Sequence, residues 1–303
     1  MRVAWVSDFS QESKLKGGAE ISEFLMMEEG RKRGHSITMF DSSLSINFDE
    51  RLYNYDLFVI NNILRFNKEQ IRKIRDNLMV PYINYLHDYN FCKYRNADCM
   101  FYNCSLCDNG NNPDYHWFGK LFDNAIFNVF LSPLHLKLTV KKYPNLTNSV
   151  IIPSPIDLSK FKPNNVQAKG NYLYFGNIYK GKGIDKVLKE FKDKGKKLCF
   201  AGQFWDPSFK EEIMKDHTYL GEIPYDKIPE LLNNFEYFIR YTPLKESFGR
   251  STVEALACGC KIISNNKIGA DSFDCSEKEL IEKCDRAPKV FWDKIEKVIK
   301  NEK

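Results

Sequence analysis

Short apolar runs alternate with stretches of helical spacing along most of the chain. The helical stretch Ala19–Arg33 follows one such run and precedes the next. The runs predict a first series of strands at Arg2–Val6, Ser36–Phe40, Tyr55–Ile60, Pro81–Leu86, Ala125–Leu131 and Val150–Ile152. They predict a second series at Asn171–Phe175, Leu198–Ala201, Glu236–Tyr241 and Cys260–Ile263. Strands that alternate with helices are typical of parallel α/β sheets.

A polar, proline-rich segment separates the two series of strands. It runs from Pro153 to Asp157 and continues with Phe161–Pro163, as expected of a linker between domains. We therefore expect an α/β protein with two Rossmann-like, doubly wound domains that face each other across a cleft. The predicted bounds are 1–153, 154–287, and a C-terminal helix over 288–303. Ligands of such sheets bind at the carboxyl ends of the strands.

The last helix is predicted from about Lys289 to Asn301. Phe291, Ile295 and Val298 lie on one side, and lysines occupy the others. An apolar stripe opposite solvated lysines is ordinary for a helix that packs on a protein surface. The alternative is a basic amphipathic helix that lies on a membrane.

Length and composition indicate a folded globular protein. The chain has 303 residues, a formal charge of +5 and 14% aromatic residues. No apolar run approaches the ~18 residues that a membrane helix needs. Met1–Ser7 has a strand pattern and does not resemble a signal peptide, so we expect a cytoplasmic protein whose cysteines are mostly reduced.

The segment from Glu246 to Ile263 contains the most informative motif. Gly249 allows a tight turn, Ser251 suits the first turn of a helix, and Glu254 lies one turn further on. Free N–H groups at such a helix start bind phosphate, and the two glutamates can accept hydrogen bonds from sugar hydroxyls. Each part alone has a simpler explanation, a dipole partner or a turn. Together they indicate a site for a sugar nucleotide.

This segment closely resembles the E-x7-E signature of the GT4 family of retaining glycosyltransferases, which have the GT-B fold. The resemblance covers nearly the whole chain. It implies that Glu254 binds the ribose of a nucleoside diphosphate sugar, and that Glu246 binds the hydroxyls of the donor sugar as a catalytic residue. Phe248, Gly249, Arg250 and Ser251 would complete this part of the donor site.

Two segments of the first domain match further motifs of the family. Gly17 and Gly18 lie in a Lys-Gly-Gly-Ala-Glu loop before the first helix, where backbone can approach a phosphate. His87 follows a strand and begins a His-Asp-Tyr motif. A histidine there can be merely structural, but the resemblance implies that His87 orients the donor sugar as a second catalytic residue.

One loop of the second domain departs from the family pattern. It runs from Phe175 to Gly183, and Lys182 is in register with the lysine that holds the diphosphate. Asn177 occupies the position where the family has an arginine, so one positive charge is missing. Our hypothesis from the sequence is that Lys180 or Arg250 compensates for it.

Four cysteines form a separate cluster in a predicted insertion over about 88–118. Cys92, Cys99, Cys104 and Cys107 have spacing suited to a structural zinc ion or an iron–sulfur cluster, although free thiols and disulfides remain open.

Together these features predict a retaining glycosyltransferase that moves a sugar from a nucleoside diphosphate sugar to an acceptor hydroxyl. By the resemblance, residues 1–153 face the acceptor, residues 154–287 bind the nucleotide sugar, and the last helix packs back on the first domain. The absence of Asp-x-Asp suggests catalysis without a metal. The acceptor would be a glycan, a lipid-linked sugar or a protein.

Two alternatives belong to other functional classes. The chain could be a sugar-nucleotide epimerase with the GT-B fold, or a non-catalytic subunit that only binds sugar nucleotides. Nucleic acid is not an expected partner because basic residues are spread among acidic ones. Peripheral contact with the inner face of a membrane, through basic clusters such as Arg31–Arg33, remains open.

Overall fold

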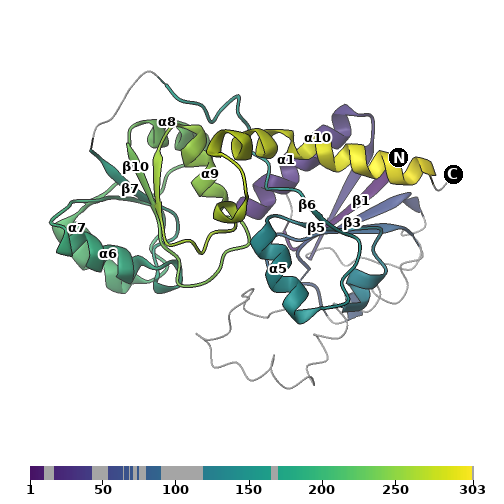
Figure 1. Cartoon of the computed structure of the whole chain (residues 1–303), viewed down its shortest axis with the longest axis horizontal. Helices are drawn as coiled ribbons and strands as arrows, with labels where there is room; N and C mark the ends of the chain where they lie inside the picture. The colour runs from purple at the N-terminus through teal and green to yellow at the C-terminus, as the bar shows by residue number, and fades with distance from the viewer. Residues whose placement is uncertain are drawn as a thin grey trace. The chain divides into compact units, whose positions relative to one another are not determined.

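The protein is an α/β molecule with two parallel sheets (Figure 1). The computed structural model describes residues 1–9, 17–42, 54–63, 65–67, 69–70, 74, 80–89, 119–164 and 170–301. The chain divides into two compact units. The first contains Met1–Pro155 and Arg286–Lys303, and the second contains Ile156–Asp285. Each unit has its own sheet and hydrophobic core, so each is described separately.

Within the described residues, the sheet of the first unit has six parallel strands in the order β2-β1-β3-β4-β5-β6. The strands are β1 (Arg2–Ser7), β2 (Ser36–Asp41), β3 (Leu57–Ile60), β4 (Tyr82–Tyr85), β5 (Asn128–Phe130) and β6 (Ser149–Ile151). Each overlaps a run predicted from the sequence. Since β1 has β2 on one side and β3 on the other, the strand order reverses between β1 and β3, which makes a topological switch point.

Successive side chains of β1 pack on opposite faces of this sheet. Ala4 and Val6 belong to a core cluster with Leu138 of helix α5 (Pro133–Lys142). Trp5 points the other way, where its ring contacts Phe291 edge-on and its indole N–H donates to Glu23 of α1 (Gly18–Lys32). Helix α5 therefore covers one face of the sheet, and α1 with the second half of α10 (Glu277–Asn301) covers the other.

Helix α10 is longer than the sequence predicted. We placed its start near Lys289, but it begins at Glu277 and continues through Pro288. A proline inside a helix leaves the carbonyl four residues earlier without its intrahelical donor. Here that carbonyl belongs to Cys284, and it accepts a hydrogen bond from the N–H of Ile156 at 3.4 Å. The helix can continue because this group has found another partner.

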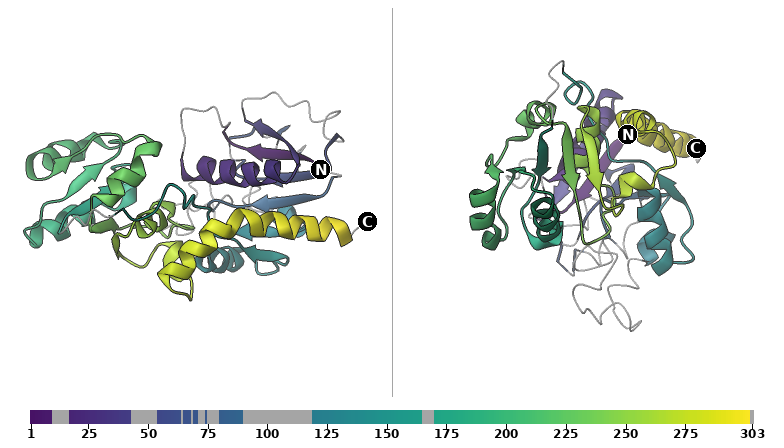
Figure 2. Two further views of the ribbon diagram at one scale, coloured as in Figure 1. Left: turned by 90° about the horizontal axis from the view of Figure 1, so that it is seen from above. Right: turned by 60° about the vertical axis from the view of Figure 1, so that its left-hand side comes forward.

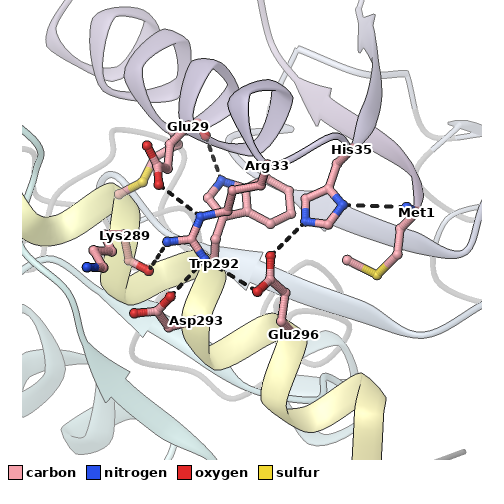
Figure 3. Close-up of polar contacts among 9 residues, drawn as sticks. Met1, Glu29, Arg33, His35, Lys289, Trp292, Asp293 and Glu296 are labelled. Atoms are coloured by element: carbon pink, nitrogen blue, oxygen red, sulfur yellow. Dashed lines mark hydrogen bonds and ion pairs between the residues drawn. The ribbon is translucent and has the colours of Figure 1, made fainter.

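The second half of α10 lies beside α1 (Figures 1 and 2). The indole N–H of Trp292 donates to the carbonyl of Met26 at 2.7 Å. Arg33 donates to Glu29, to Asp293, to Glu296 and to the carbonyl of Lys289 (Figure 3). These polar contacts surround a buried aromatic group, and they join segments more than 250 positions apart in the sequence.

His35 joins the start of the chain to the same helix. The N-terminal amino group of Met1 lies 3.4 Å from Nδ1 of His35, and Nε2 lies 3.0 Å from Oε1 of Glu296 (Figure 3). An ammonium group can only donate, so Nδ1 is the acceptor and Nε2 carries the proton that Glu296 accepts.

Within the described residues, the sheet of the second unit has five parallel strands in the order β11-β10-β7-β8-β9. The strands are β7 (Tyr172–Phe175), β8 (Cys199–Ala201), β9 (Thr218–Tyr219), β10 (Tyr237–Arg240) and β11 (Lys261–Ser264). The sequence did not predict β9, because two residues are too short for a recognisable pattern. The strand order reverses between β7 and β10, so the switch point of this sheet lies there.

Helices cover both faces of this second sheet. Helices α6 (Ile184–Asp193) and α7 (Lys210–Asp216) lie on one side, and α8 (Ile228–Asn233) and α9 (Arg250–Ala257) lie on the other (Figure 1). Val187 of α6 and Ile213 of α7 share a core cluster with Ile239 of β10. The helices pack because their apolar stripes match this sheet surface.

In the part of the chain that the structure describes, no helix is both long and apolar enough to cross a membrane. The four cysteines of the predicted insertion, Cys92, Cys99, Cys104 and Cys107, lie outside the described residues.

Candidate functional site

The motif residues of the second unit gather at the carboxyl end of its sheet. Strand β7 ends at Phe175 and continues into the loop with Asn177, and β10 ends at Arg240 and continues toward Glu246. These are the two strands that flank the switch point. Loops leave such a point in opposite directions, and ligands of open α/β sheets bind between them.

Helix α9 begins at this edge with a backbone that only glycine can form. Gly249 has a φ angle of 87°, and a Cβ atom on it would lie 2.3 Å from Cγ2 of Ile268. Gly249 precedes the first helical residue and has no side chain to cover the first turn. Main-chain N–H groups and the positive end of the helix dipole are therefore presented at the site, and both favour an anion.

Arg250 and Glu254 lie one turn apart, on one side of α9. Nε of Arg250 donates to Oε1 of Glu254 at 2.8 Å, and both side chains are buried. Tyr225 joins them, since its hydroxyl donates to Oε1 of Glu254 at 3.1 Å and accepts from Nη2 of Arg250 at 2.8 Å. Burial raises the pKa of Tyr225, so the hydroxyl keeps its proton. The three groups hold the Glu254 carboxylate in one orientation.

Sequence reasoning missed Tyr225. It lies in a short 3-10 helix, Tyr225–Lys227, that no motif marks. Only the fold brings it to α9, so no local pattern could have identified it.

Glu246 precedes the helix start and lies between two cations. Its Oε1 atom accepts from Nζ of Lys182 at 2.5 Å and from Nη2 of Arg240 at 2.7 Å. Burial by itself would raise the pKa of Glu246, but the two cations outweigh burial and lower it to about 2. Burial lowers the pKa of Lys182, while Glu246 opposes this change. The sequence predicted Glu246 and Lys182 for this site, but not Arg240.

The other predicted donor residues have different environments. The Asn177 carbonyl accepts from the hydroxyl of Tyr174 at 3.1 Å. Phe248 is buried and packs edge-on against Phe273, where it supports the turn at Gly249. Ser251 is half-buried in the first turn of α9, and Lys180 is exposed.

Gly17 and Gly18 lie at the start of α1, in the first unit. The side chain of Glu20 turns back and accepts from the N–H of Gly17 at 2.7 Å. This contact caps the helix at its first turn. Gly17 lies between β1 and α1, as the sequence predicted, whereas Gly18 is already the first residue of α1.

His87 follows β4 and is buried beside Glu23. Its Nε2 atom lies 3.2 Å from Oε1 of Glu23, which also accepts from the hydroxyl of Ser7 at 2.9 Å. Burial raises the pKa of Glu23, and His87 acts in the opposite direction. Sequence reasoning missed Glu23, because a glutamate within a charged helical segment is usually solvent-exposed.

Residues 156–303 match the family model described as Glycosyl transferases group 1. No curated protein sequence matches the chain.

Several solved structures share the fold. The Anabaena protein HepE in complex with UDP is 14% identical, with a TM-score of 0.66 over 89% of this chain and 82% of that one. Sucrose-phosphate synthase from Thermosynechococcus elongatus is 16% identical, with a TM-score of 0.69 over 89% of this chain and 82% of that one. AviGT4, a glycosyltransferase involved in avilamycin A biosynthesis, is 13% identical, with a TM-score of 0.56 over 93% and 87%.

The two parallel sheets and these neighbours define a protein of the GT-B fold. The match to the group 1 glycosyl transferases covers the second unit and the last helix of this protein.

Proposed function

We propose that the protein is a retaining, GT4-type glycosyltransferase that moves a sugar from a nucleoside diphosphate sugar to an acceptor hydroxyl. One observation carries the proposal: two carboxylates lie at the start of α9, at the switch point of a parallel sheet. Glu246, with its side chain 14% exposed, precedes the helix, and the buried Glu254 lies one turn into it. A helix start suits phosphate, and carboxylates suit sugar hydroxyls. A sugar nucleotide carries both kinds of group.

In this mechanism the diphosphate leaves with a developing negative charge. Lys182 and the N–H groups at the start of α9 stabilise that charge, and they do so more strongly in the transition state than in the bound donor. Glu254, fixed by Tyr225 and Arg250, accepts hydrogen bonds from the ribose hydroxyls. Glu246 accepts hydrogen bonds from the hydroxyls of the donor sugar.

The family resemblance also assigns roles to residues of the first unit. His87 orients the donor sugar, and Gly17 and Gly18 let backbone approach the donor. Residues 1–153 are the acceptor side, and exclusion of water from the reacting groups favours transfer over hydrolysis. Two solved structures of HepE contain UDP with glucose and UDP-glucose, which supports UDP-glucose as the first donor to try.

The proposed reaction uses no catalytic metal, since protein groups hold the phosphates and the sequence contains no Asp-x-Asp. A structural zinc ion at the four cysteines remains a prediction from their spacing. The cytoplasmic location, the peripheral contact with a membrane and the nature of the acceptor (glycan, lipid-linked sugar or protein) also rest on the sequence alone.

Donor binding and slow donor hydrolysis test the proposal. UDP-, GDP-, ADP- and dTDP-sugars are compared on the wild-type protein and on Glu254→Ala. We expect one donor to be bound and slowly hydrolysed, with both properties lost in the variant. That donor is then taken into a screen of acceptors, and NMR of the product anomeric proton reports retention.

Other outcomes contradict particular parts of the proposal. Binding without hydrolysis or transfer to any acceptor favours a silent binding subunit. Conversion of the donor without an acceptor favours an epimerase. No binding of any donor by the folded protein overturns the assignment of this site.

A further inference from the structure

Arg240 is a buried cation that the proposed mechanism has not used. It is the last residue of β10, its side chain is 7% exposed, and it lies at the switch point of the sheet. A guanidinium group taken out of water is costly unless anions and hydrogen bonds compensate. A buried arginine at a ligand-binding edge is therefore expected to pair with an anion of the protein or of the ligand.

The pairing of Arg240 is incomplete. Nη2 donates to Oε1 of Glu246 at 2.7 Å, but Nε is buried without a hydrogen-bond partner among the residues that the structure describes. The same oxygen of Glu246 also accepts from Lys182 at 2.5 Å. One carboxylate thus serves two cations, and the three groups together carry one surplus positive charge.

We propose that Arg240 is the second cation of the diphosphate site, and that Glu246 Oε1 occupies the place of a phosphate oxygen when the site is empty. This inference rests on the proposed function. A single anionic oxygen held between an ammonium and a guanidinium group has the geometry of an anion subsite. The planar guanidinium suits the paired oxygens of a diphosphate better than a point charge would.

This assignment resolves the missing charge at Asn177. A Cβ atom on Gly176, the residue before Asn177, would lie 3.3 Å from Nη1 of Arg240. The guanidinium of Arg240 therefore reaches the loop where the family pattern places an arginine. In this protein the positive charge comes from an arginine at the end of β10, and not from one after the neighbouring strand β7.

The two residues first considered for this role fit less well. Lys180 is exposed to solvent. Arg250 is already bound to Glu254 and to Tyr225. Arg240 combines burial, position and an unused donor.

Binding of the donor then exchanges one anion for another. The diphosphate takes over Lys182 and Arg240, and Glu246 is released to accept hydrogen bonds from the sugar hydroxyls. In a merely structural role, Arg240 would only neutralise Glu246. The two accounts differ in what happens when the carboxylate is removed, because only exchange predicts tighter binding of a nucleoside diphosphate.

Calorimetric titration separates the two accounts. UDP, GDP, ADP and dTDP are first titrated into the wild-type protein, and the best ligand is then compared with its nucleoside on each variant. We expect Arg240→Gln to weaken the diphosphate at least tenfold and leave the nucleoside unchanged, with Arg240→Lys in between. We expect Glu246→Gln to tighten the diphosphate several-fold. Lys186→Gln, an exposed lysine in the first turn of α6, is the matched control.

Unchanged diphosphate affinity in folded Arg240→Gln would overturn the inference, as would equal weakening of diphosphate and nucleoside. If Lys180→Gln weakens binding of the diphosphate tenfold and Arg240→Gln does not, Lys180 is the second cation of the diphosphate site. If Arg240→Gln does not fold, Arg240→Lys and Glu246→Gln decide, and the inference fails if Glu246→Gln binds no tighter. If the wild-type protein binds none of the four nucleoside diphosphates, the proposed function itself fails.

Discussion

Trp292 of α10 lies directly against Gly30 of α1. A Cβ atom at Gly30 would be 2.2 Å from Cζ2 of the Trp292 ring, closer than two carbon atoms can approach. The tryptophan is fully buried, and its N–H is bound to the carbonyl of Met26. The absence of a side chain at Gly30 therefore determines how closely the last helix can approach the first one.

Gly30→Ala is expected to destabilise the protein by about 1–3 kcal/mol, the usual cost of an extra methyl group in a filled core. The ring cannot move away without losing its hydrogen bond to Met26. Denaturant unfolding followed by tryptophan fluorescence measures the effect. Gly119→Ala is the control, because a Cβ there would meet only Tyr143 within the described part of the chain, at an ordinary 3.6 Å. Equal stability of the two variants would contradict the account.

Arg33 is expected to contribute more to stability than the neighbouring Arg31. Its side chain is 17% exposed and donates to three carboxylates and a carbonyl. Arg31 is 42% exposed and, among the described residues, pairs only with Glu28. We expect Arg33→Met to cost about 1–3 kcal/mol and Arg31→Met to cost less than about 1 kcal/mol. Thermal unfolding of the two variants side by side gives the comparison. A larger loss at Arg31 would show that the contacts in Figure 3 contribute little.

The fold was predictable because its signals are local. Strands such as Arg2–Val6 are short apolar runs, and Gly249 marks the turn at which α9 begins. The extent of α10 was not predictable in this way. A proline normally ends a helix, and only the distant N–H of Ile156 makes Pro288 tolerable.

The candidate site was predictable only where its residues belong to one segment. Lys182, Glu246 and Glu254 lie in motifs that can be recognised along the chain. Arg240 and Tyr225 could not be identified in that way. Arg240 ends a strand whose pattern predicts only a buried β-run, and Tyr225 reaches Glu254 from 29 positions away. Their roles arise from the fold, which places the ends of separate segments together.

The stability contribution of Glu246 is expected to depend on pH. Its pKa is lowered in the folded protein from an ordinary 4.5 to about 2, so folding favours its ionised form. The contribution is fully present above about pH 4.5 and is lost as the pH falls toward 2. A difference of this size corresponds to about 3 kcal/mol.

Glu246→Gln should therefore destabilise the protein at pH 6 and lose most of this effect near pH 2. Urea unfolding of wild type and variant across that range measures the difference. Glu230→Gln, at an exposed carboxylate that pairs loosely with Lys227, is the control. A difference between wild type and Glu246→Gln that stays constant from pH 6 to pH 2 would be inconsistent with an ion pair that favours folding.

Tyr225→Phe is expected to weaken donor binding while the protein remains folded. The hydroxyl group of Tyr225 both donates to Glu254 and accepts from Arg250, so its removal leaves Glu254 with one contact fewer and Arg250 with an unused N–H group. The carboxylate can then turn away from the orientation that suits the ribose. A lost hydrogen bond to a charged group costs about 1.5–3 kcal/mol, which corresponds to a roughly tenfold or greater rise in the dissociation constant. Titration with the nucleoside diphosphate that the wild type binds best measures this change. Tyr219→Phe is the matched control, because it loses a hydroxyl contact to the carbonyl of Gly202 in the same unit.

The ribose assignment of Glu254 requires that the nucleoside alone also binds less tightly to Tyr225→Phe. If only the diphosphate part of the affinity falls, the Tyr225–Arg250–Glu254 group serves the phosphates, and the role of Glu254 must be reassigned.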